Sequence, residues 1–411
     1  MAIMLASMVA AAAALLPCSS SLDCSLNGMC TAGVCVCDRP WKDARTEACS
    51  VLDVEPHPDA YIPAYGGPRT STAYQKQNLT SWGGNILLAD DGKYHLFVSA
   101  MDGGVGLRGW GSISRIDHAV ADDPMGVFEL VDTPLRKEAH NASPLRAKNG
   151  SYLLFHIGSS GDSSKSNPVA PPDSFSPIGR HVVLAGGGSS FAHHAETPDG
   201  PWYPLSGPRC NNPAPMLANN GTAFVGCNDG GFHIYKSDDV FAGKWTQVTT
   251  MAFPPSWGAN APSYLKNEDP YLWMDRRGNF HLLAHRYDYR DGYPPNPNQT
   301  MPLHVSGHGF STDGVAWHFN VEQQPYDALI RFHNGTTQQF STYERPHLVF
   351  DPESGLPTHL VNGVQPYWMG PDGPCDGCDR RAGSMHSCVV CKTTEGIDYT
   401  YTLVSKLNVD A

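Results

Sequence analysis

The segment DPYLWMDRRGNFHLLAH, Asp269 to His285, is one of five copies of a phrase in this chain of 411 residues. Each copy opens with small or polar residues, continues as a short apolar run, turns at a glycine and returns as a second apolar run. The other copies are Gly83 to Phe97, Asn141 to Phe155, Asn212 to Gly226 and Glu344 to Val361. Asp-Gly and Asn-Gly pairs near their centres predict β-hairpins with two-residue turns, which need positive φ angles.

A second phrase follows each first one, in which a strand enters an acidic turn with Pro or Gly and leaves on an aromatic residue. Its copies are Ala119 to Phe128, His194 to Leu205, Lys236 to Trp245, Phe310 to Phe319 and Lys392 to Tyr401. Two hairpins in a fixed order make a four-stranded antiparallel unit that cannot bury its apolar face alone. The repeats therefore predict an all-β fold, a five-bladed β-propeller of four-stranded antiparallel blades. A β-sandwich or Greek-key barrel is the alternative, but neither explains two alternating phrases.

The N-terminus indicates export. Residues 1–17 open with an apolar stretch, Ile3 to Leu16, which is short for a bilayer span and ends in small residues, as a signal peptide does. A signal anchor is the alternative, because no Lys or Arg stands in the first positions. Six N-x-S/T sequons fit a secreted glycoprotein: Asn78, Asn141, Asn149, Asn220, Asn298 and Asn334. A net charge of −12 disfavours nucleic acid as a partner.

Six of the twelve cysteines lie within residues 18–50, a size at which disulfides replace a hydrophobic core. The spacing C-x5-C-x5-C-x4-C-x-C-x11-C by itself leaves 15 pairings open. The segment resembles the EGF-like family, including Gly33 in CTAGVCVC. That resemblance implies three disulfides, namely Cys18–Cys30, Cys24–Cys35 and Cys37–Cys49.

The other six cysteines form two groups. Cys210 and Cys227 flank the first hairpin of the third repeat and are predicted to form a disulfide across it. The second group has the spacing C-x2-C-x9-C-x2-C, which fits a zinc site or two disulfides. A secreted chain favours the disulfides, and no metal site is predicted there. The members of this group are Cys375, Cys378, Cys388 and Cys391.

Polar residues begin each first phrase and are expected to converge at one end of the central channel. The acidic ones, Glu268, Asp269 and Glu344, are the predicted catalytic groups, because carboxyls brought together in this way can act as acid and base. Hydrogen bonds that tie strand ends are the structural alternative. Glu344 and Arg345 could equally form a structural ion pair. The predicted substrate-binding residues are Trp82, Asn85, His140, Asn141, Asn212, Arg345 and His285.

The predicted propeller, residues 55–408, resembles over roughly residues 60 to 405 the five-bladed glycosidase superfamily, glycoside hydrolase family 43 and its relatives in families 32, 62, 68 and 117. The closest matches are DPYL at Asp269 and TPDGPW at Thr197 to Trp202. The resemblance implies three acidic groups around the channel, the base or nucleophile being on the first blade. Here Gly83 to Asn85 offer no carboxylate at that place, and the second and third blades carry Asn141 and Asn212.

Two functions follow as expectations. The first is a secreted, monomeric glycoside hydrolase that acts on an extracellular polysaccharide or oligosaccharide by carboxylate acid/base catalysis. The second is a carbohydrate-binding or adhesion protein whose propeller has lost its catalytic base. Carbohydrate is the expected partner in both, without stable membrane insertion once the signal is cleaved. No cofactor is predicted, although calcium in the central channel stays an option.

Overall fold

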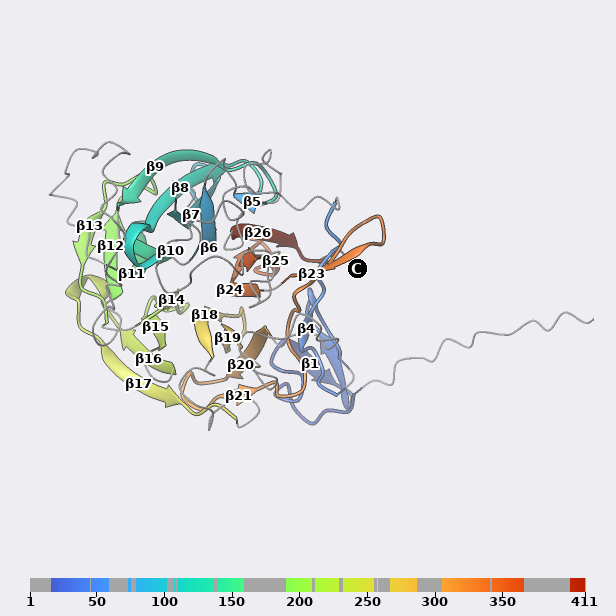
Figure 1. The fold of residues 1–411 in the computed structure, drawn as a ribbon. Helices are drawn as coiled ribbons and strands as arrows, with labels where there is room; N and C mark the ends of the chain where they lie inside the picture. The colour runs from blue at the N-terminus through green and yellow to red at the C-terminus, as the bar shows by residue number, and fades with distance from the viewer. Residues whose placement is uncertain are drawn as a thin grey trace, which may run out of the picture.

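The computed structural model describes residues 16–44, 46–58, 73–74, 79–101, 107, 110–136, 139–158, 190–208, 211–228, 232–254, 257, 267–286, 305–340, 342–365 and 400–410. These form five four-stranded antiparallel sheets arranged as blades around a common centre (Figure 1). The prediction of a five-bladed propeller is confirmed. Among the described residues, no helix is long and apolar enough to cross a membrane. The predicted signal sequence lies almost wholly outside them.

The first four blades follow the sequence in order from the innermost to the outermost strand. Blade one contains β6 (Thr80–Leu88), β7 (Tyr94–Met101), β8 (Arg115–Ala121) and β9 (Glu129–Leu135). Blade two contains β10 (Ala139–Arg146), β11 (Tyr152–Gly158), β12 (Ser190–Ala195) and β13 (Tyr203–Leu205). Blade three contains β14 (Ala214–Leu217), β15 (Ala223–Asn228), β16 (Phe232–Ser237) and β17 (Thr246–Met251). Blade four contains β18 (Glu268–Met274), β19 (Phe280–His285), β20 (Ser306–Ser311) and β21 (His318–Phe319).

The fifth blade closes the ring in a way that the repeats do not predict. Its strands are β24 (Thr342–Phe350), β25 (Pro357–Gln365), β26 (Tyr401–Lys406) and, outermost, β5 (Ala73–Tyr74). Of the second phrase at Lys392 to Tyr401 only the last two residues are described, and the outermost strand of this blade is β5 instead of a strand that follows that phrase. Pairing of β26 with a strand from near the N-terminus joins the two ends of the propeller within one sheet.

In the first four blades the hairpin turns between the first and second strands are one residue longer than predicted. In blade one the Ala89 and Lys93 backbones pair, and Gly92 N–H donates to the Ala89 carbonyl. Only the glycine of this turn has a positive φ, 79°. This is a three-residue loop that ends on a left-handed glycine, and it needs one special residue where a two-residue turn of type I′ needs two. The same pattern recurs at Gly150, Gly221 and Gly278.

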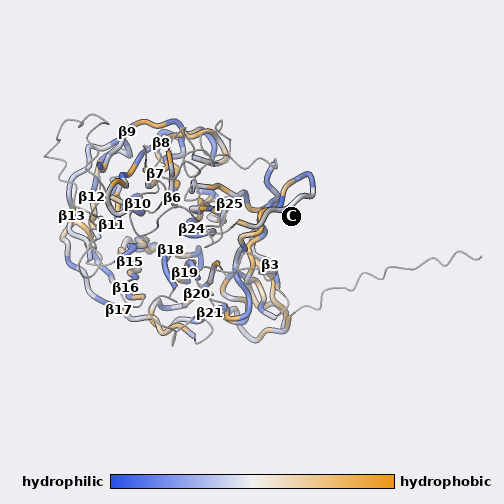
Figure 2. Tube along the Cα trace, in the orientation of Figure 1, coloured by the Kyte–Doolittle hydropathy of each residue, from blue (hydrophilic) through white to orange (hydrophobic). Residues whose placement is uncertain are grey.

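Apolar side chains are buried between neighbouring blades, as a repeat architecture requires. Ile86 and Leu96 of blade one pack in one cluster with Val349 and Val404 of blade five. On the other side of blade one, a cluster joins its strands to Trp202 of blade two. Hydrophilic residues lie on strands near the centre, including β18 and β24 (Figure 2). The centre of the ring thus carries polar residues, in contrast to the apolar contacts between neighbouring blades.

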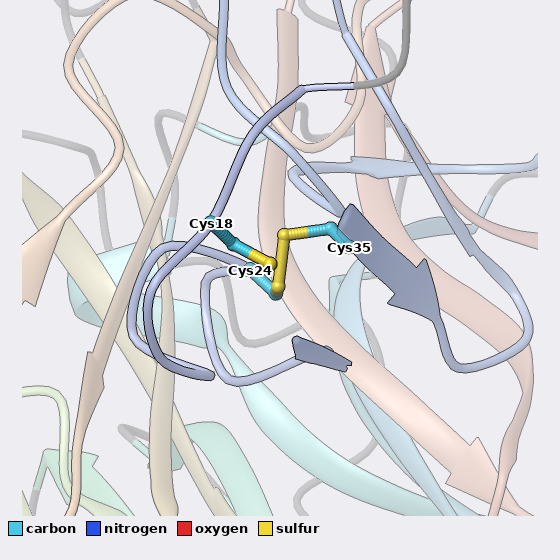
Figure 3. Close-up of side chains that lie close together, drawn as sticks. All are labelled: Cys18, Cys24 and Cys35. Carbon is cyan, nitrogen blue, oxygen red and sulfur yellow. A yellow bond between two sulfur atoms is a disulfide. The ribbon is translucent and has the colours of Figure 1, made fainter. Parts of the chain in front are cut away.

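The N-terminal module contains β1 (Gly28–Thr31), β2 (Val34–Cys37), β3 (Trp41–Lys42) and β4 (Val51–Leu52). All three disulfides implied by the EGF-like resemblance are present. Figure 3 shows the Cys24–Cys35 bond beside Cys18. Cys227 is also disulfide-bonded, whereas its predicted partner Cys210 and the four cysteines from 375 to 391 lie outside the described residues.

The module packs against blade four. The ring of Trp41 stacks on Trp273 with centroids 6.5 Å apart and lies 5.0 Å from His308. The Glu47 carboxylate accepts hydrogen bonds from the backbone N–H groups of residues 321 to 323. A short hairpin, β22 (Leu329–Arg331) and β23 (Thr337–Gln339), adjoins it. The module is thus built into the side of the propeller. The described residues also include a single helical turn, α1 (Trp110–Ile113), and a 3-10 turn, η2 (Val240–Ala242).

Candidate active site

A β-bulge interrupts the innermost strand of blades one, two, four and five at the same place, and in blade three the equivalent residue, Asn212, lies just before β14. At each of the five places this residue adopts the left-handed conformation, with φ between 45° and 62°. We call these five residues the bulge ring: Gly83, Asn141, Asn212, Asp269 and Arg345. Left-handed geometry is uncommon for Asp and Arg, and such residues concentrate at functional sites. A bulge also re-aims a side chain, which explains how residues so far apart in sequence come to face one another.

Hydrogen bonds link four members of the bulge ring. Asn141 Nδ2 donates to Asn212 Oδ1 at 2.7 Å, and Asn212 Nδ2 donates to Asp269 Oδ1 at 2.9 Å. Arg345 Nη1 lies 2.9 Å from the same Asp269 oxygen. Every donor is directed toward Asp269, so that this carboxylate ends a chain of amides and a guanidinium. Four residues predicted from the sequence are therefore brought together.

Gly83, the fifth member, provides room for Arg345. A β-carbon at residue 83 would lie 3.1 Å from Arg345 Cδ. The family resemblance places an acidic base or nucleophile on this blade, and here a cation from blade five fills the space next to a glycine. The sequence did not indicate that Arg345 occupies the space beside Gly83, because the two residues are separated by more than half of the chain.

One residue earlier in each blade lies a second layer, which we call the rim layer. Its members are Trp82, His140, Asn211, Glu268 and Glu344. Glu268 and Glu344 hold equivalent places on adjacent blades and are partly exposed, Glu344 by 16% of its side chain. Asp269, in contrast, is 3% exposed. The carboxyls that can meet a ligand are thus Glu268 and Glu344, with Asp269 sealed beneath them.

The other predicted binding residues are divided between the site and the core. His285 lies on β19 opposite Glu268, with Nδ1 3.5 Å from Glu344 Oε2. His140 Nδ1 is 2.7 Å from Ser114 Oγ, which anchors it within the strand ends. Trp82 and Asn85 are buried, and Trp82 packs on Gly363 of blade five.

Burial dominates the electrostatics of this site. It raises the pKa of Glu344 well above the usual range, and the neighbouring Asp269 and Glu268 carboxyls add to the shift. Burial also raises the pKa of Asp269, to about 8, although the Arg345 guanidinium opposes the change. Because Asp269 Oδ1 accepts from a guanidinium and an amide, groups that stabilise a carboxylate, we assign the shared proton to Glu344. His285 stays neutral, since burial lowers its pKa to about 3.

A cavity of about 20 Å³ lies at the bulge ring. Its walls include Asn141, Asn212, Asp269, Arg345 and His347. A volume of roughly 10–15 Å³ is enough for one water molecule, so that this cavity suits water and is too small for a sugar ring. Asp269 Oδ2 has no hydrogen-bond partner among the described residues. A water molecule in the cavity would satisfy it, and a glycan would have to bind on the rim side.

The cluster of Asp269, His285 and Glu344 has the composition of a cation site. One ligand atom from each lies within 4.8 Å of the others. However, the Arg345 guanidinium already neutralises Asp269 at 2.9 Å, and a second cation there would be repelled. The same proximity serves acid/base chemistry, because two carboxyls at this separation cannot both ionise easily.

Neutral buried histidines make the whole fold sensitive to acid. Burial lowers the pKa of His156, His285 and His347 to about 3 and of His57 and His359 to about 4. The unfolded chain takes up protons below pH 6.5, where the folded chain does not, so that stability falls as pH falls from 6.5 toward 3. Each group contributes a slope of about 1.4 kcal/mol per pH unit. The raised pKa values of Asp269 and Glu344 instead favour the folded chain as pH falls, but these groups are fewer than the histidines.

We therefore expect the melting temperature at pH 5.0 to lie ~10 °C below that at pH 7.5, as measured by scanning calorimetry. His156 lies away from the rim layer, and a His156→Gln variant should show a shallower pH dependence. Equal melting temperatures at the two pH values would contradict this account.

Comparison with known proteins supports the fold. No family model and no curated protein matches the sequence. A glycosyl hydrolase from Bacteroides ovatus is similar in structure, with a TM-score of 0.51, 12% identity and coverage of 90% of this chain and 96% of that one. A family 117 glycoside hydrolase from Zobellia galactanivorans has a TM-score of 0.46, 12% identity and coverage of 88% and 91%. A thermostable family-43 glycoside hydrolase has a TM-score of 0.48, 11% identity and coverage of 83% and 93%. At 12% identity, the similarity to the Bacteroides ovatus structure shows a shared fold alone.

Proposed function

We propose that this protein is an extracellular glycoside hydrolase in which Glu344 and Glu268 act on a glycosidic bond at the rim of the channel. The observation that carries the proposal is the pair of partly exposed carboxyls at equivalent places on adjacent blades, above a buried Asp269. Glycosidases need one carboxyl that holds a proton and one that is ionised. Burial gives Glu344 the raised pKa of a general acid.

In this mechanism Glu344 protonates the leaving oxygen of the sugar. Glu268 acts as the base or nucleophile. Asp269 stays fixed by Asn212 and Arg345, and its charge helps to keep the proton on Glu344. His285, neutral and 3.5 Å from Glu344, supports that side chain. Three disulfides in the N-terminal module fit an oxidising, extracellular location.

The test is hydrolysis of a panel of polysaccharides and aryl glycosides by the secreted protein, beside a Glu268→Gln/Glu344→Gln double variant. We expect turnover by the native protein and none by the variant. The exposed Glu322→Gln variant is the control for loss of a carboxylate elsewhere. No turnover on any substrate, or equal turnover by the double variant, would contradict the proposal.

A second function, carbohydrate binding without catalysis, has one observation in its favour. Arg345 stands against Gly83, where the family resemblance places the catalytic base. A guanidinium there would favour binding of a polar or anionic sugar over attack on it. Retention on a glycan array by both the native protein and the double variant, without turnover, would support this alternative.

A further inference from the structure

Blades one and four carry the same pair of buried histidines, away from the rim layer. In blade one His95 on β7 lies beside His118 on β8, with Nδ1 of the first 2.8 Å from Nε2 of the second. In blade four His281 on β19 lies beside His308 on β20, with the same two atoms 3.2 Å apart. All four side chains are at most 1% exposed. The two pairs differ in the side chains that stand at their outer ends.

The blade-four pair is balanced as two neutral rings. Asn320 Nδ2, a donor, lies 3.2 Å from His308 Nδ1, which therefore accepts. The His308 Nε2–H then donates to His281 Nδ1, and His281 Nε2–H points at Asp275 Oδ2, 3.6 Å away. Neutral imidazole carries one N–H. The two neutral rings thus supply two N–H groups, one for the contact between the rings and one directed at Asp275.

The contacts of the blade-one pair need one proton, and so one positive charge, more than two neutral rings supply. Asp132 pairs with His118 across β8 and β9, the place that Asn320 holds beside His308. Its Oδ1 lies 3.0 Å from His118 Nδ1. At the other end Asp91 Oδ2 lies 3.2 Å from His95 Nε2. Carboxylates only accept, so that the three contacts need three protons, whereas two neutral imidazoles supply two.

A second carboxylate faces the same nitrogen from the next blade. Asp199, in the turn between β12 and β13, has Oδ1 3.9 Å from His118 Nδ1. The Asp132 and Asp199 side chains are 42% and 61% exposed, whereas His118 is completely buried. An ion can thus reach the carboxylates from solvent, while the imidazole is held in place by His95 behind it.

From this geometry we infer that His118 Nδ1, Asp132 and Asp199 bind a divalent transition-metal cation such as Zn²⁺. Two ligands of a tetrahedral zinc ion are about 3.3 Å apart, and the distances of 3.0 and 3.9 Å from His118 Nδ1 bracket that value. The metal takes the place of the third proton. His118 Nε2–H then donates to His95, and His95 Nε2–H donates to Asp91.

The donor set explains the choice of metal. Imidazole with carboxylates suits zinc and its neighbours, whereas Ca²⁺ and Mg²⁺ prefer oxygen ligands alone. A ligating histidine usually donates its other N–H to a fixed acceptor, and here His95 is that acceptor. Because Asp199 comes from blade two and the other ligands from blade one, the ion would also join two blades. The site is independent of the proposed hydrolase activity.

The test is calorimetric titration of the secreted, tag-free chain with ZnCl₂ after chelator treatment. The key variant is Asp132→Asn, which gives blade one the amide that blade four has in Asn320. Asp199→Asn removes the ligand from blade two. Asp122→Asn is the matched control, since Asp122 is an exposed neighbour paired with Lys93 and does not contact the histidines.

We expect one Zn²⁺ per native chain, and at least about tenfold weaker binding in the Asp132 and Asp199 variants. Asp122→Asn should bind as the native chain does, and MgCl₂ and CaCl₂ should not compete. Zn²⁺ should raise the melting temperature of the native chain but not that of Asp132→Asn, whose metal-free melting temperature shows that it folds. Undiminished zinc binding by Asp132→Asn, or no saturable binding by the native chain, would overturn the inference.

Discussion

Replacement of Glu344 by glutamine is expected to lower kcat/KM by about 10²- to 10⁴-fold on glycans with ordinary sugar leaving groups. Glutamine keeps the size of the side chain but cannot give a proton to the departing oxygen. An aryl glycoside with a strongly acidic phenol leaves without protonation, so that its hydrolysis should be nearly unchanged. Comparison of the two substrate types therefore separates loss of the acid from general damage to the site.

The pH profile provides an independent check on this role. Burial and neighbouring carboxyls raise the pKa of Glu344, and a general acid works only when protonated. The kcat/KM of the native enzyme should thus fall as pH rises through that pKa, and this limb should vanish in Glu344→Gln. Glu268→Gln should instead lose activity on both substrate types. Equal losses on both substrate types in Glu344→Gln, with the limb retained, would show that Glu344 is not the acid.

Replacement of Arg345 by methionine is expected to destabilise the fold by about 3–5 kcal/mol, the range for breaking a buried ion pair. The Arg345 and Asp269 side chains are 11% and 2% exposed, and without the guanidinium Asp269 would be a buried charge with one amide donor. An Arg345→Met/Asp269→Asn double variant removes the charge as well and should recover most of the loss. Urea unfolding of the native protein, both single variants and the double variant measures this coupling.

The destabilisation of Arg345→Met should also depend on pH. Without the guanidinium, the folded-state pKa of Asp269 rises further above that of an unfolded Asp, so that the folded state binds the extra proton. Stability must then fall as pH rises from about 4 through this raised folded-state pKa. The defect should be larger at pH 8 than at pH 5. A defect of equal size at both values, unrelieved by Asp269→Asn, would mean that Arg345 acts through packing alone.

The sequence was sufficient to predict the architecture. Apolar alternation and turn glycines are local signals, and five repetitions of them left little freedom in the choice of fold. The disulfide pairing of the N-terminal module needed a family resemblance, because spacing alone permits many pairings. The turn length was wrong by one residue, since Asp-Gly and Asn-Gly pairs serve both kinds of turn and only the backbone pairing distinguishes them.

The sequence also identified the polar starts of the repeats, and therefore Asn141, Asn212, Asp269 and Arg345 as one set. Their division into two layers could not be predicted. Glu268 and Asp269 are neighbours in the chain, yet the bulge between them turns one toward the rim and the other into the bulge ring. Only the tertiary structure shows that Asp269 is sealed by Arg345 and that Gly83 makes room for it.

The repeats, the turns and the disulfide module were determined by the sequence itself, because the physical causes of these features act within a few residues. Contacts between blades were decided by the tertiary structure. These contacts keep Glu344 protonated, pair Arg345 with Asp269 and bring Asp199 next to His118. Burial and charge at these places depend on residues from different blades, and no local pattern in the chain records which side chains the closed ring brings face to face.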